Sequence, residues 1–230
     1  MDGRALVLGG GGVTGVAWET GMLAGLAGAG VDLTGADLVV GTSAGSVVAA
    51  QITSGRTLDA LYAAQQEVDG AEIAATMRVG NLARYVWLAL TSRSAEAYRA
   101  RLGRASLRAR TVPAEARRKV IEARLAGADW PQRRVVITAV DADSGEFVTF
   151  DPDSGVSLVD AVGASCAVPL VWPPVAIGDR RYVDGGVRST ANADLASGYA
   201  RVVVLAPLTG GGGRVPSVAR QADELRAAGA

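Results

Sequence analysis

The stretch VVGTSAGSVVAA, residues 39–50, decides how this chain folds. Two valines lead into the pentapeptide Gly41-Thr42-Ser43-Ala44-Gly45, and small and apolar residues follow it. A G-x-S-x-G pattern between a buried strand and a helix is typical of a sharp turn that exposes a serine hydroxyl. The pattern therefore predicts a strand, a tight turn and a helix, with Ser43 as a candidate nucleophile. A plain tight turn is the alternative, because the chain holds 30 glycines.

A similar unit precedes this one in the chain. Residues 5–8 form an apolar run, residues 9–12 are four consecutive glycines, and residues 13–28 favour a helix. Buried parallel strands are apolar throughout, as this run is. The order strand, glycine loop, helix, strand, glycine turn, helix predicts an α/β fold with a parallel-rich central sheet and helices on both faces.

The remaining chain divides into a helical part and a second strand-forming part. Residues 56–130 are rich in Ala, Arg, Glu and Leu, and we interpret them as a helical insert of three or four helices, the last opening at Pro113. The predicted elements after it are a hairpin of strands 134–140 and 146–150, a helix 157–168 capped by Ser157, a strand 202–205 and a helix 217–228. We interpret residues 1–230 as one domain. The chain ends where an α/β protein usually enters its next strand, so a missing C-terminal strand is an open alternative.

The composition excludes several classes of protein. Hydrophobic residues make up 49% of the 230 residues, enough for one α/β core. There is no uninterrupted apolar run of membrane-spanning length, and strand-forming residues begin at position 5, so we expect neither a transmembrane helix nor a secretory signal and place the protein in the cytoplasm. Histidine is absent and Cys166 is the only cysteine, so we expect no metal, no cofactor and a buried Cys166. Nucleic acid is not an expected partner.

Positive charge is concentrated in residues 93–119. This segment holds nine cations and two anions, a net charge of +7, whereas the whole chain is neutral. We interpret it as a solvated face with internal ion pairs, and a peripheral contact with an anionic membrane surface is the alternative. Residues 85–90 (YVWLAL) are interpreted as part of a core helix, with a membrane-facing lid as the alternative.

The first glycine loop has two functional interpretations. Gly10-x-Gly12-x-x-Gly15 satisfies the dinucleotide fingerprint, but that fingerprint also needs an acid at the end of the next strand, where this chain has Val40-Gly41. The phosphate-binding loop of nucleoside triphosphatases is excluded, because the lysine that this loop needs is missing here. Consecutive glycines can also direct backbone N–H groups at one oxygen, which predicts an oxyanion hole.

Without histidine, a serine nucleophile needs another base. Lys119 and a tyrosine are weak candidates, which leaves a carboxylate. Asp184 follows a short strand-forming run and precedes Gly185-Gly186, which would let the backbone approach another loop. A hairpin turn is the alternative for Asp-Gly-Gly. Likewise, Asp141-x-Asp143-x-Gly145 departs from a calcium loop and is better explained as a hairpin turn.

These segments together resemble the patatin-like phospholipases, lipid acyl hydrolases with a Ser-Asp dyad and no catalytic histidine. The matching blocks are the glycine loop, the Ser43 pentapeptide, GASCAVPLVWPPV before the aspartate, and Asp184-Gly185-Gly186. The resemblance covers residues 4–50 and 134–206. It implies Ser43 as nucleophile and Asp184 as base, and the expected oxyanion donors are the N–H groups of Gly10, Gly11, Gly12 and Ala44. The expected motif glycines are Gly15, Gly41, Gly45, Gly185 and Gly186.

The resemblance also implies the reaction and its substrate. We expect hydrolysis of a lipid or other acyl ester through a serine acyl-enzyme. The family often has Arg or Lys where this chain has Thr14, so a cation beside the oxyanion loop is missing. The alternatives are a lipid-binding or regulatory module without activity, an acyltransferase that shares the acyl-enzyme, and a dinucleotide-binding protein.

Overall fold

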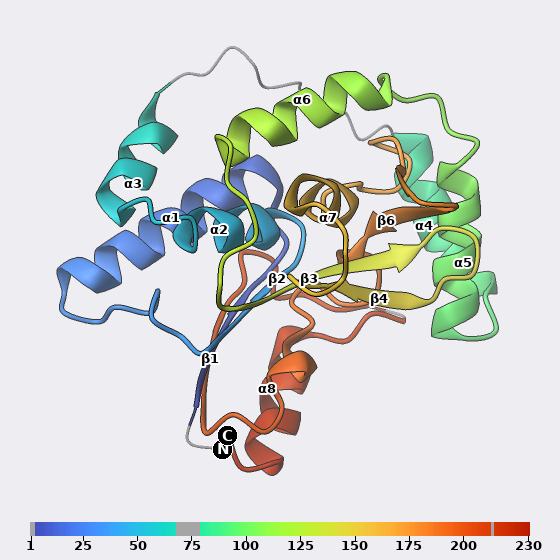
Figure 1. Cartoon of the computed structure of the whole chain (residues 1–230). Coiled ribbons are helices and arrows are strands. Elements are labelled where there is room, and N and C mark those ends of the chain that lie inside the picture. The colour runs from blue at the N-terminus through green and yellow to red at the C-terminus, as the bar shows by residue number, and fades with distance from the viewer. Residues whose placement is uncertain (1–2, 68–78, 213) are drawn as a thin grey trace.

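The computed structural model describes residues 3–67, 79–212 and 214–230 (Figure 1). Its centre is a seven-stranded sheet with the order β5-β6-β3-β2-β1-β7, and β4 pairs with β3. The strands are β1 (Arg4–Leu8), β2 (Leu38–Gly41), β3 (Arg134–Asp141), β4 (Phe147–Phe150), β5 (Val175–Ile177), β6 (Arg180–Asp184) and β7 (Arg201–Leu205). Parallel pairing joins β7, β1, β2 and β3, whereas β4, β5 and β6 pair antiparallel. This mostly parallel sheet confirms the predicted fold class.

Helices cover both faces of the sheet. They are α1 (Gly12–Gly28), α2 (Ala44–Ile52), α3 (Leu58–Gln66), α4 (Val79–Thr91), α5 (Ala95–Ser106), α6 (Ala114–Leu125), α7 (Leu158–Ser165) and α8 (Val218–Ala227). One core cluster packs α1, α2, α3, α6 and α7 against one face of the sheet. A second cluster packs α8 against β1 and β2 on the opposite face, and a third packs α4 and α5 against β3 and β6. Figure 1 shows α1, α2, α6 and α7 on one side of the sheet and α8 on the other.

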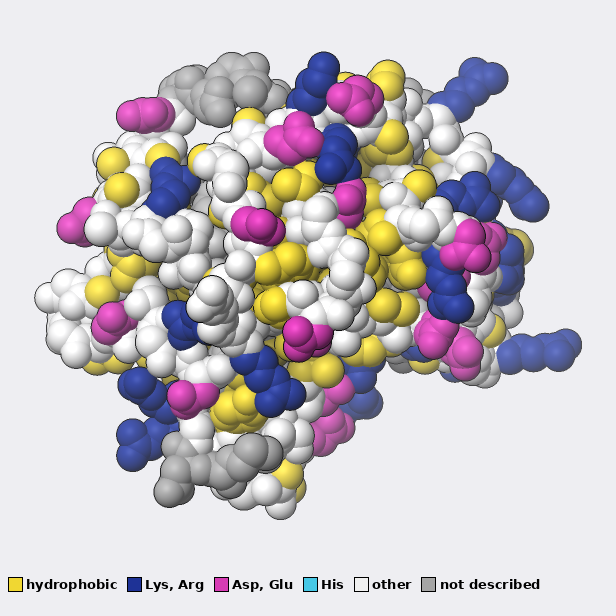
Figure 2. Space-filling view, viewed as in Figure 1, with side chains coloured by type: hydrophobic (Ala, Val, Ile, Leu, Met, Phe, Trp, Pro, Cys, Tyr) yellow, Lys and Arg dark blue, Asp and Glu magenta, His cyan; other side chains and the backbone are white. Residues whose placement is uncertain are grey.

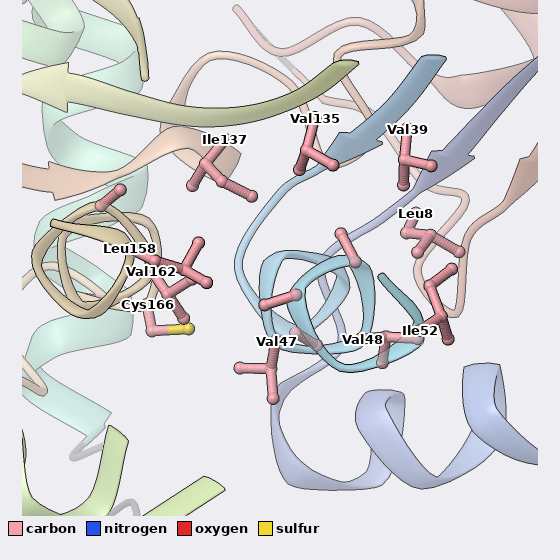
Figure 3. Close-up of a cluster of buried hydrophobic side chains, with 14 of the residues drawn as sticks. Leu8, Val39, Val47, Val48, Ile52, Val135, Ile137, Leu158, Val162 and Cys166 are labelled. Atoms are coloured by element: carbon pink, nitrogen blue, oxygen red, sulfur yellow. The ribbon is translucent and has the colours of Figure 1, made fainter. Parts of the chain in front are cut away.

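The strand sequences explain these layers. In β1, Leu6 and Leu8 belong to one core cluster, and Ala5 and Val7 belong to the cluster on the opposite face. Successive side chains of a strand point to opposite faces, so a strand covered on both sides is apolar throughout. Figure 3 shows side chains of β2 and β3 facing those of α2 and α7 across the larger cluster. This packing fixes the two segments that carry the candidate site.

The described residues of the stretch 56–130 are mainly helical, as predicted. They hold α3, α4, α5 and α6, and α6 begins directly after Pro113. The interpretation of residues 85–90 as a core helix is wrong in part. Leu88 is 4% exposed, but Trp87 and Leu90 on α4 are 57% and 80% exposed. The helix packs on the sheet along one side only and leaves an apolar side open.

Other boundaries differ slightly from the predictions. The hairpin of β3 and β4 is confirmed, and the Asp141 carboxylate accepts hydrogen bonds from the backbone N–H groups of Asp143 and Ser144, as a turn requires. Ser157 caps α7, as predicted. That helix ends at Ser165 rather than at residue 168, because the chain turns before Pro169. The three-residue strand β5 is too short to give a clear pattern in the sequence.

Candidate active site

Ser43 lies at the sharp turn between β2 and α2. β2 ends at Gly41, α2 begins at Ala44, and Ser43 has φ 54° and ψ −117°. Positive φ is unfavourable for a residue with a side chain, and such strain persists only where the surroundings enforce it, as at active sites. The Ser43 side chain is therefore presented above the carboxyl edge of the sheet by a backbone that stores strain.

The glycines that flank Ser43 are required by close packing. A Cβ atom on Gly45 would lie 2.1 Å from the Leu8 carbonyl oxygen, and one on Gly41 would lie 2.6 Å from the Ser46 Cα. A side chain at position 45 would push the turn away from β1, and one at position 41 would collide with the first turn of α2. The structure thus explains both glycines of the pentapeptide by contact.

The segment before Pro169 forms hydrogen bonds that hold the Ser43 turn in position. The Ser43 N–H donates to Ser165 Oγ at 2.9 Å, and Cys166 Sγ donates to the Ser43 carbonyl oxygen at 3.2 Å. The Asp184 N–H donates to the Ala167 carbonyl oxygen at 3.0 Å. Sequence reasoning missed these roles, although the matching block GASCAVPLVWPPV includes these residues. Cys166 is buried and free, as predicted.

Asp184 comes to the same place from the end of β6. Gly41 pairs with Ile137 of β3, and Asp184 pairs with Ala139, two residues further along the same strand. Ser43, two residues beyond Gly41, therefore lies at the level of Asp184. The Asp184 carboxylate is close enough to the Ser43 hydroxyl for that group to lower its pKa, and it accepts a hydrogen bond from the Gly186 N–H at 2.7 Å.

The surroundings make Asp184 a stronger base than an ordinary aspartate. Its side chain is 4% exposed, and this burial raises the pKa of Asp184 from 3.8 to about 6. The Ser43 hydroxyl, the hydrogen bond from the Gly186 N–H and the positive charge of Arg117 oppose the rise in pKa. A base works best when its pKa lies near the working pH, so this shift suits proton transfer from a serine.

The predicted alternatives to Asp184 are poorly placed as bases. Tyr85 donates its hydroxyl to the Pro169 carbonyl oxygen at 2.8 Å, and burial raises the pKa of Tyr85 far above neutral pH, so it stays protonated. Lys119 is exposed on α6 and pairs with Glu115 at 3.9 Å. Neither group offers Ser43 a proton acceptor.

The glycine loop supplies N–H groups beside Ser43. Among the described residues, nothing accepts from the N–H groups of Gly11, Gly12 and Ala44. Gly10 differs, because its N–H donates to the Thr190 carbonyl oxygen at 2.7 Å. The expected donor role of Gly10 therefore needs correction: that hydrogen is already used, and Gly10 instead lines the cavity.

The remaining motif glycines allow close approaches. A Cβ on Gly11 would lie 2.7 Å from the Gly15 Cα, and one on Gly185 would lie 2.2 Å from Thr138 Oγ1. Gly186 holds Asp184 through its N–H. The Thr14 hydroxyl donates to the Gly11 carbonyl oxygen at 3.2 Å, so this residue braces the loop.

A buried polar network behind the site was not predicted. Thr42 Oγ1 lies 2.9 Å from Thr138 Oγ1, and Asn192 Nδ2 donates to Thr42 Oγ1 at 3.0 Å. Asn192 also donates to the Gly185 carbonyl oxygen at 3.3 Å. The network joins the Ser43 turn, β3 and the segment after Asp184. Isolated Thr and Asn residues far apart in the sequence carry no signal of such contacts.

Ser43 and Asp184 both line a cavity of about 390 Å³. Its polar lining residues include Ser43, Asp184 and Thr190, and its apolar ones include Leu82, Val168, Pro169, Val187, Leu208 and Val215. This volume lies within the range of about 300–1,000 Å³ that is usual for small-molecule pockets. The helical insert contributes Leu82 and Tyr85 from α4 and Tyr98 from α5. An apolar cavity with one polar centre can hold a hydrocarbon chain beside a reactive carbonyl.

The basic segment is not one uniform face. Arg118 pairs with Glu122 and Asp160, Arg99 donates to the Gly145 carbonyl oxygen, and Arg117 is only 8% exposed. Figure 2 shows acidic side chains among the basic ones at the edge where α4 and α5 lie. Solvated ion pairs thus account for part of the segment, as predicted, and Arg117 is an exception.

Residues 3–67, 79–212 and 214–230 contain neither a metal-binding cluster nor a membrane-spanning helix. No group of three or more His, Cys, Asp or Glu side chains there is arranged to hold a metal ion. Within the same ranges, every helix falls short of the length and apolar character needed to cross a membrane.

Comparisons with known proteins place the site in context. The sequence profile described as "patatin-like phospholipase" matches residues 6–197. VipD from Legionella pneumophila is 15% identical over 81% of this chain and 46% of its own, with a TM-score of 0.47. The type III effector protein ExoU is 19% identical over 99% of this chain and 51% of its own, with a TM-score of 0.40. This chain therefore spans about half the length of each, and no curated protein sequence matches it.

Proposed function

Because the chain belongs to the patatin-like phospholipase family, we propose that it hydrolyses lipid acyl esters through a Ser43–Asp184 dyad. One observation carries this proposal. A strained, buried serine and a buried carboxylate that senses its hydroxyl line the same apolar cavity. A chain without histidine has in this carboxylate the base that a serine nucleophile needs.

The first half of the proposed reaction forms an acyl-enzyme. Ser43 Oγ attacks the ester carbonyl carbon while Asp184 takes the hydroxyl proton. The carbonyl oxygen becomes an oxyanion, which the N–H groups of Gly11, Gly12 and Ala44 stabilise. The intermediate collapses, the bond to the alcohol breaks, and Asp184 returns its proton to the departing alkoxide.

The second half releases the acid. Water gives a proton to Asp184 and attacks the acyl carbonyl carbon, which forms a second oxyanion in the same position. Collapse breaks the bond to Ser43 Oγ, and the proton on Asp184 passes to that oxygen. Both halves use the same base and donors, so the enzyme is regenerated unchanged.

Turnover of a soluble short-chain ester tests this proposal against its rivals. We expect the purified protein to release one equivalent of acid per ester cleaved, followed by titration at constant pH. Transfer of the acyl group to an added alcohol in preference to water would make the protein an acyltransferase. Saturable lipid binding without turnover would make it a binding module, and saturable binding of a nucleotide would favour the dinucleotide alternative.

The pH profile should follow Asp184. The base must be ionised to accept a proton, and burial raises the pKa of Asp184 to about 6. We therefore expect kcat/KM to rise about tenfold per pH unit below pH 6 and to level off above it. The measurement is kcat/KM on a soluble ester from pH 4 to 9. A midpoint near the ordinary aspartate value of about 4 would contradict the buried base.

We also propose that the open side of α4 contacts a lipid surface. Leu82, Val86, Trp87 and Leu90 are all more than half exposed, and their spacing places them on one side of the helix. Leu82 also lines the cavity, so this side continues to the mouth of the site. The Arg101 guanidinium lies 4.9 Å from the Trp87 ring and adds a positive charge there.

Vesicle binding tests this contact. Leu90→Glu should weaken binding to anionic vesicles at least about tenfold, because burying a leucine side chain contributes about 1.5–3 kcal/mol. Val31→Glu is the matched control, because Val31 is 49% exposed in the loop after α1, at the opposite edge of the sheet. Wild-type binding should fall between low and physiological salt. Equal weakening by both variants, or salt-independent binding, would contradict the proposal.

A further inference from the structure

A second, smaller cavity adjoins Ser43. It has a volume of about 210 Å³ and shares Gly12, Ser43 and Val168 with the larger cavity. Its other lining residues are Val13, Ala44, Arg117, Arg124, Cys166, Val171 and Trp172. Ser43 therefore lies where two cavities meet, and an ester bound there would extend into both.

The two cavities differ in chemistry. Asp184 is the charged group among the described residues that line the larger cavity, whereas the smaller one is lined by the cations Arg117 and Arg124. The smaller volume lies below the range of about 300–1,000 Å³ for pockets that hold a whole small molecule. It suits one compact anionic group better than a hydrocarbon chain.

The Arg117 side chain is positioned to bind a compact anionic group. Its guanidinium carbon lies 4.1 Å from the centre of the Trp172 ring, and the residue is 8% exposed. Arg124 lies seven residues, or two turns, further along α6 and so lies on the same side of the helix. A guanidinium that lies over an aromatic ring still offers a planar set of donors that match phosphate oxygens.

Two helix starts add positive potential to the same cavity. α1 begins at Gly12 and α2 begins at Ala44, and both residues line it. The first N–H groups of a helix lack intrahelical acceptors and carry partial positive charge. Together with the two arginines, they make the smaller cavity attractive to an anion.

We propose that the smaller cavity binds a phosphate group on the alcohol part of the ester, while the acyl chain occupies the larger cavity. This inference rests on the proposed ester hydrolysis. The ester carbonyl carbon carries two branches, the acyl chain and the alcohol oxygen, and each cavity receives one. Arg117 and Arg124 thereby select esters of phosphorylated alcohols over uncharged ones.

A ratio of two activities tests the assignment. We would measure kcat/KM for a soluble dihexanoyl phospholipid and for the dihexanoylglycerol that lacks the phosphate. Arg117→Gln should lower the ratio of phospholipid to glyceride activity at least about tenfold, the loss expected for one charged hydrogen bond. Arg124→Gln should lower it in the same direction. The ratio cancels any change in Asp184, whose pKa Arg117 lowers, because both substrates use the same base.

Lys119→Gln is the matched control. It removes the same charge from the same helix, but Lys119 is exposed and lies outside both cavities. The ratio should stay at the wild-type value in this variant, and Arg117→Lys should restore part of it. An unchanged ratio in both Arg117→Gln and Arg124→Gln would overturn the proposal. So would inorganic phosphate that binds as tightly as the phospholipid, since this would indicate a site for free anions.

Binding separates failure of this inference from failure of the proposed reaction. If wild-type protein cleaves neither ester, the hydrolase proposal fails, and calorimetry with the corresponding dihexyl ether lipids still tests the phosphate site. Arg117→Gln should then weaken binding of the phosphate-bearing ether at least about tenfold more than binding of the uncharged ether. Equal weakening of both would overturn the phosphate site.

Discussion

Ser43→Ala is expected to abolish ester hydrolysis and to leave the fold intact. The substitution removes the atom that attacks the carbonyl carbon, while the N–H and carbonyl groups of residue 43 keep their contacts with Ser165 and Cys166. Loss of a nucleophile that acts together with its base costs about 10⁴-fold or more in kcat. The measurement is kcat/KM on one soluble ester, with circular dichroism as the check on folding. More than a few per cent of residual activity would contradict the assignment.

Ser43→Gly provides a sharper version of this experiment. Glycine tolerates the positive φ of 54° that strains Ser43. This variant should be as inactive as Ser43→Ala but more stable than it, by about 1 kcal/mol or more. Thermal unfolding of the two variants checks the comparison. Equal stability would mean that the turn at residue 43 is not strained.

Asp184→Asn is expected to lower kcat at least about 10²-fold, the usual contribution of a general base. Asparagine keeps the shape of the side chain and can accept from the Gly186 N–H, but it cannot take the serine proton. Combining it with Ser43→Ala should cost hardly more than either change alone, because the two groups act as a unit. Asp143→Asn, in the exposed turn after β3, is the control and should stay within about twofold of wild type. Near-normal activity of Asp184→Asn would mean that Ser43 has another base.

The same variant should be more stable than the wild type at neutral pH. Burial raises the pKa of Asp184 from 3.8 to about 6, so the folded protein holds this proton more tightly than the unfolded chain does. The free energy of unfolding therefore falls as the pH rises from about 4 to about 6, and above pH 6 the full destabilisation by the buried charge is present. Asparagine carries no charge and avoids this cost, so the gain at pH 7 should be about 1–3 kcal/mol. A melting temperature below that of the wild type would contradict the buried, charged Asp184.

The sequence was sufficient to predict the parts of the fold that depend on local pattern. The apolar run of β1, the glycine loop and the Ser43 turn each carry their own signal, and their order implies a parallel sheet. The Ser-Asp dyad was predicted by the combination of three ordered motifs with the absence of histidine. Each motif alone also fitted a plain turn.

Contacts between distant segments could not be predicted in this way. Ser165 and Asn192 hold the Ser43 turn across more than 100 residues of chain, and neither residue's local sequence indicates which distant group it contacts. Glu19 is fully buried in α1, and burial raises the pKa of Glu19 to about 9, yet its position in the sequence looks like a solvent-facing helix site. Arg117 likewise belongs to a run of charged residues whose sequence predicts a solvent-exposed face.

Gly10 shows that sequence alone does not predict which backbone N–H groups stay available for a ligand. Four consecutive glycines predict an oxyanion loop but do not show which N–H groups remain available. The Thr190 carbonyl oxygen takes the Gly10 N–H, and that contact depends on a segment 180 residues away. Register and loop packing, which arise only in the folded chain, thus select Gly11, Gly12 and Ala44 as the proposed donors.

The most direct test of the central claim is covalent capture of the nucleophile. A fluorophosphonate ester reacts with an activated serine when the hydroxyl oxygen displaces fluoride from phosphorus. Mass spectrometry of the intact protein should show one adduct on the wild type, and peptide mapping should place it on Ser43. Labelling should slow strongly in Asp184→Asn and be absent in Ser43→Ala. An adduct on another residue, or wild-type protein that stays unlabelled, would contradict the assignment of Ser43 as the nucleophile.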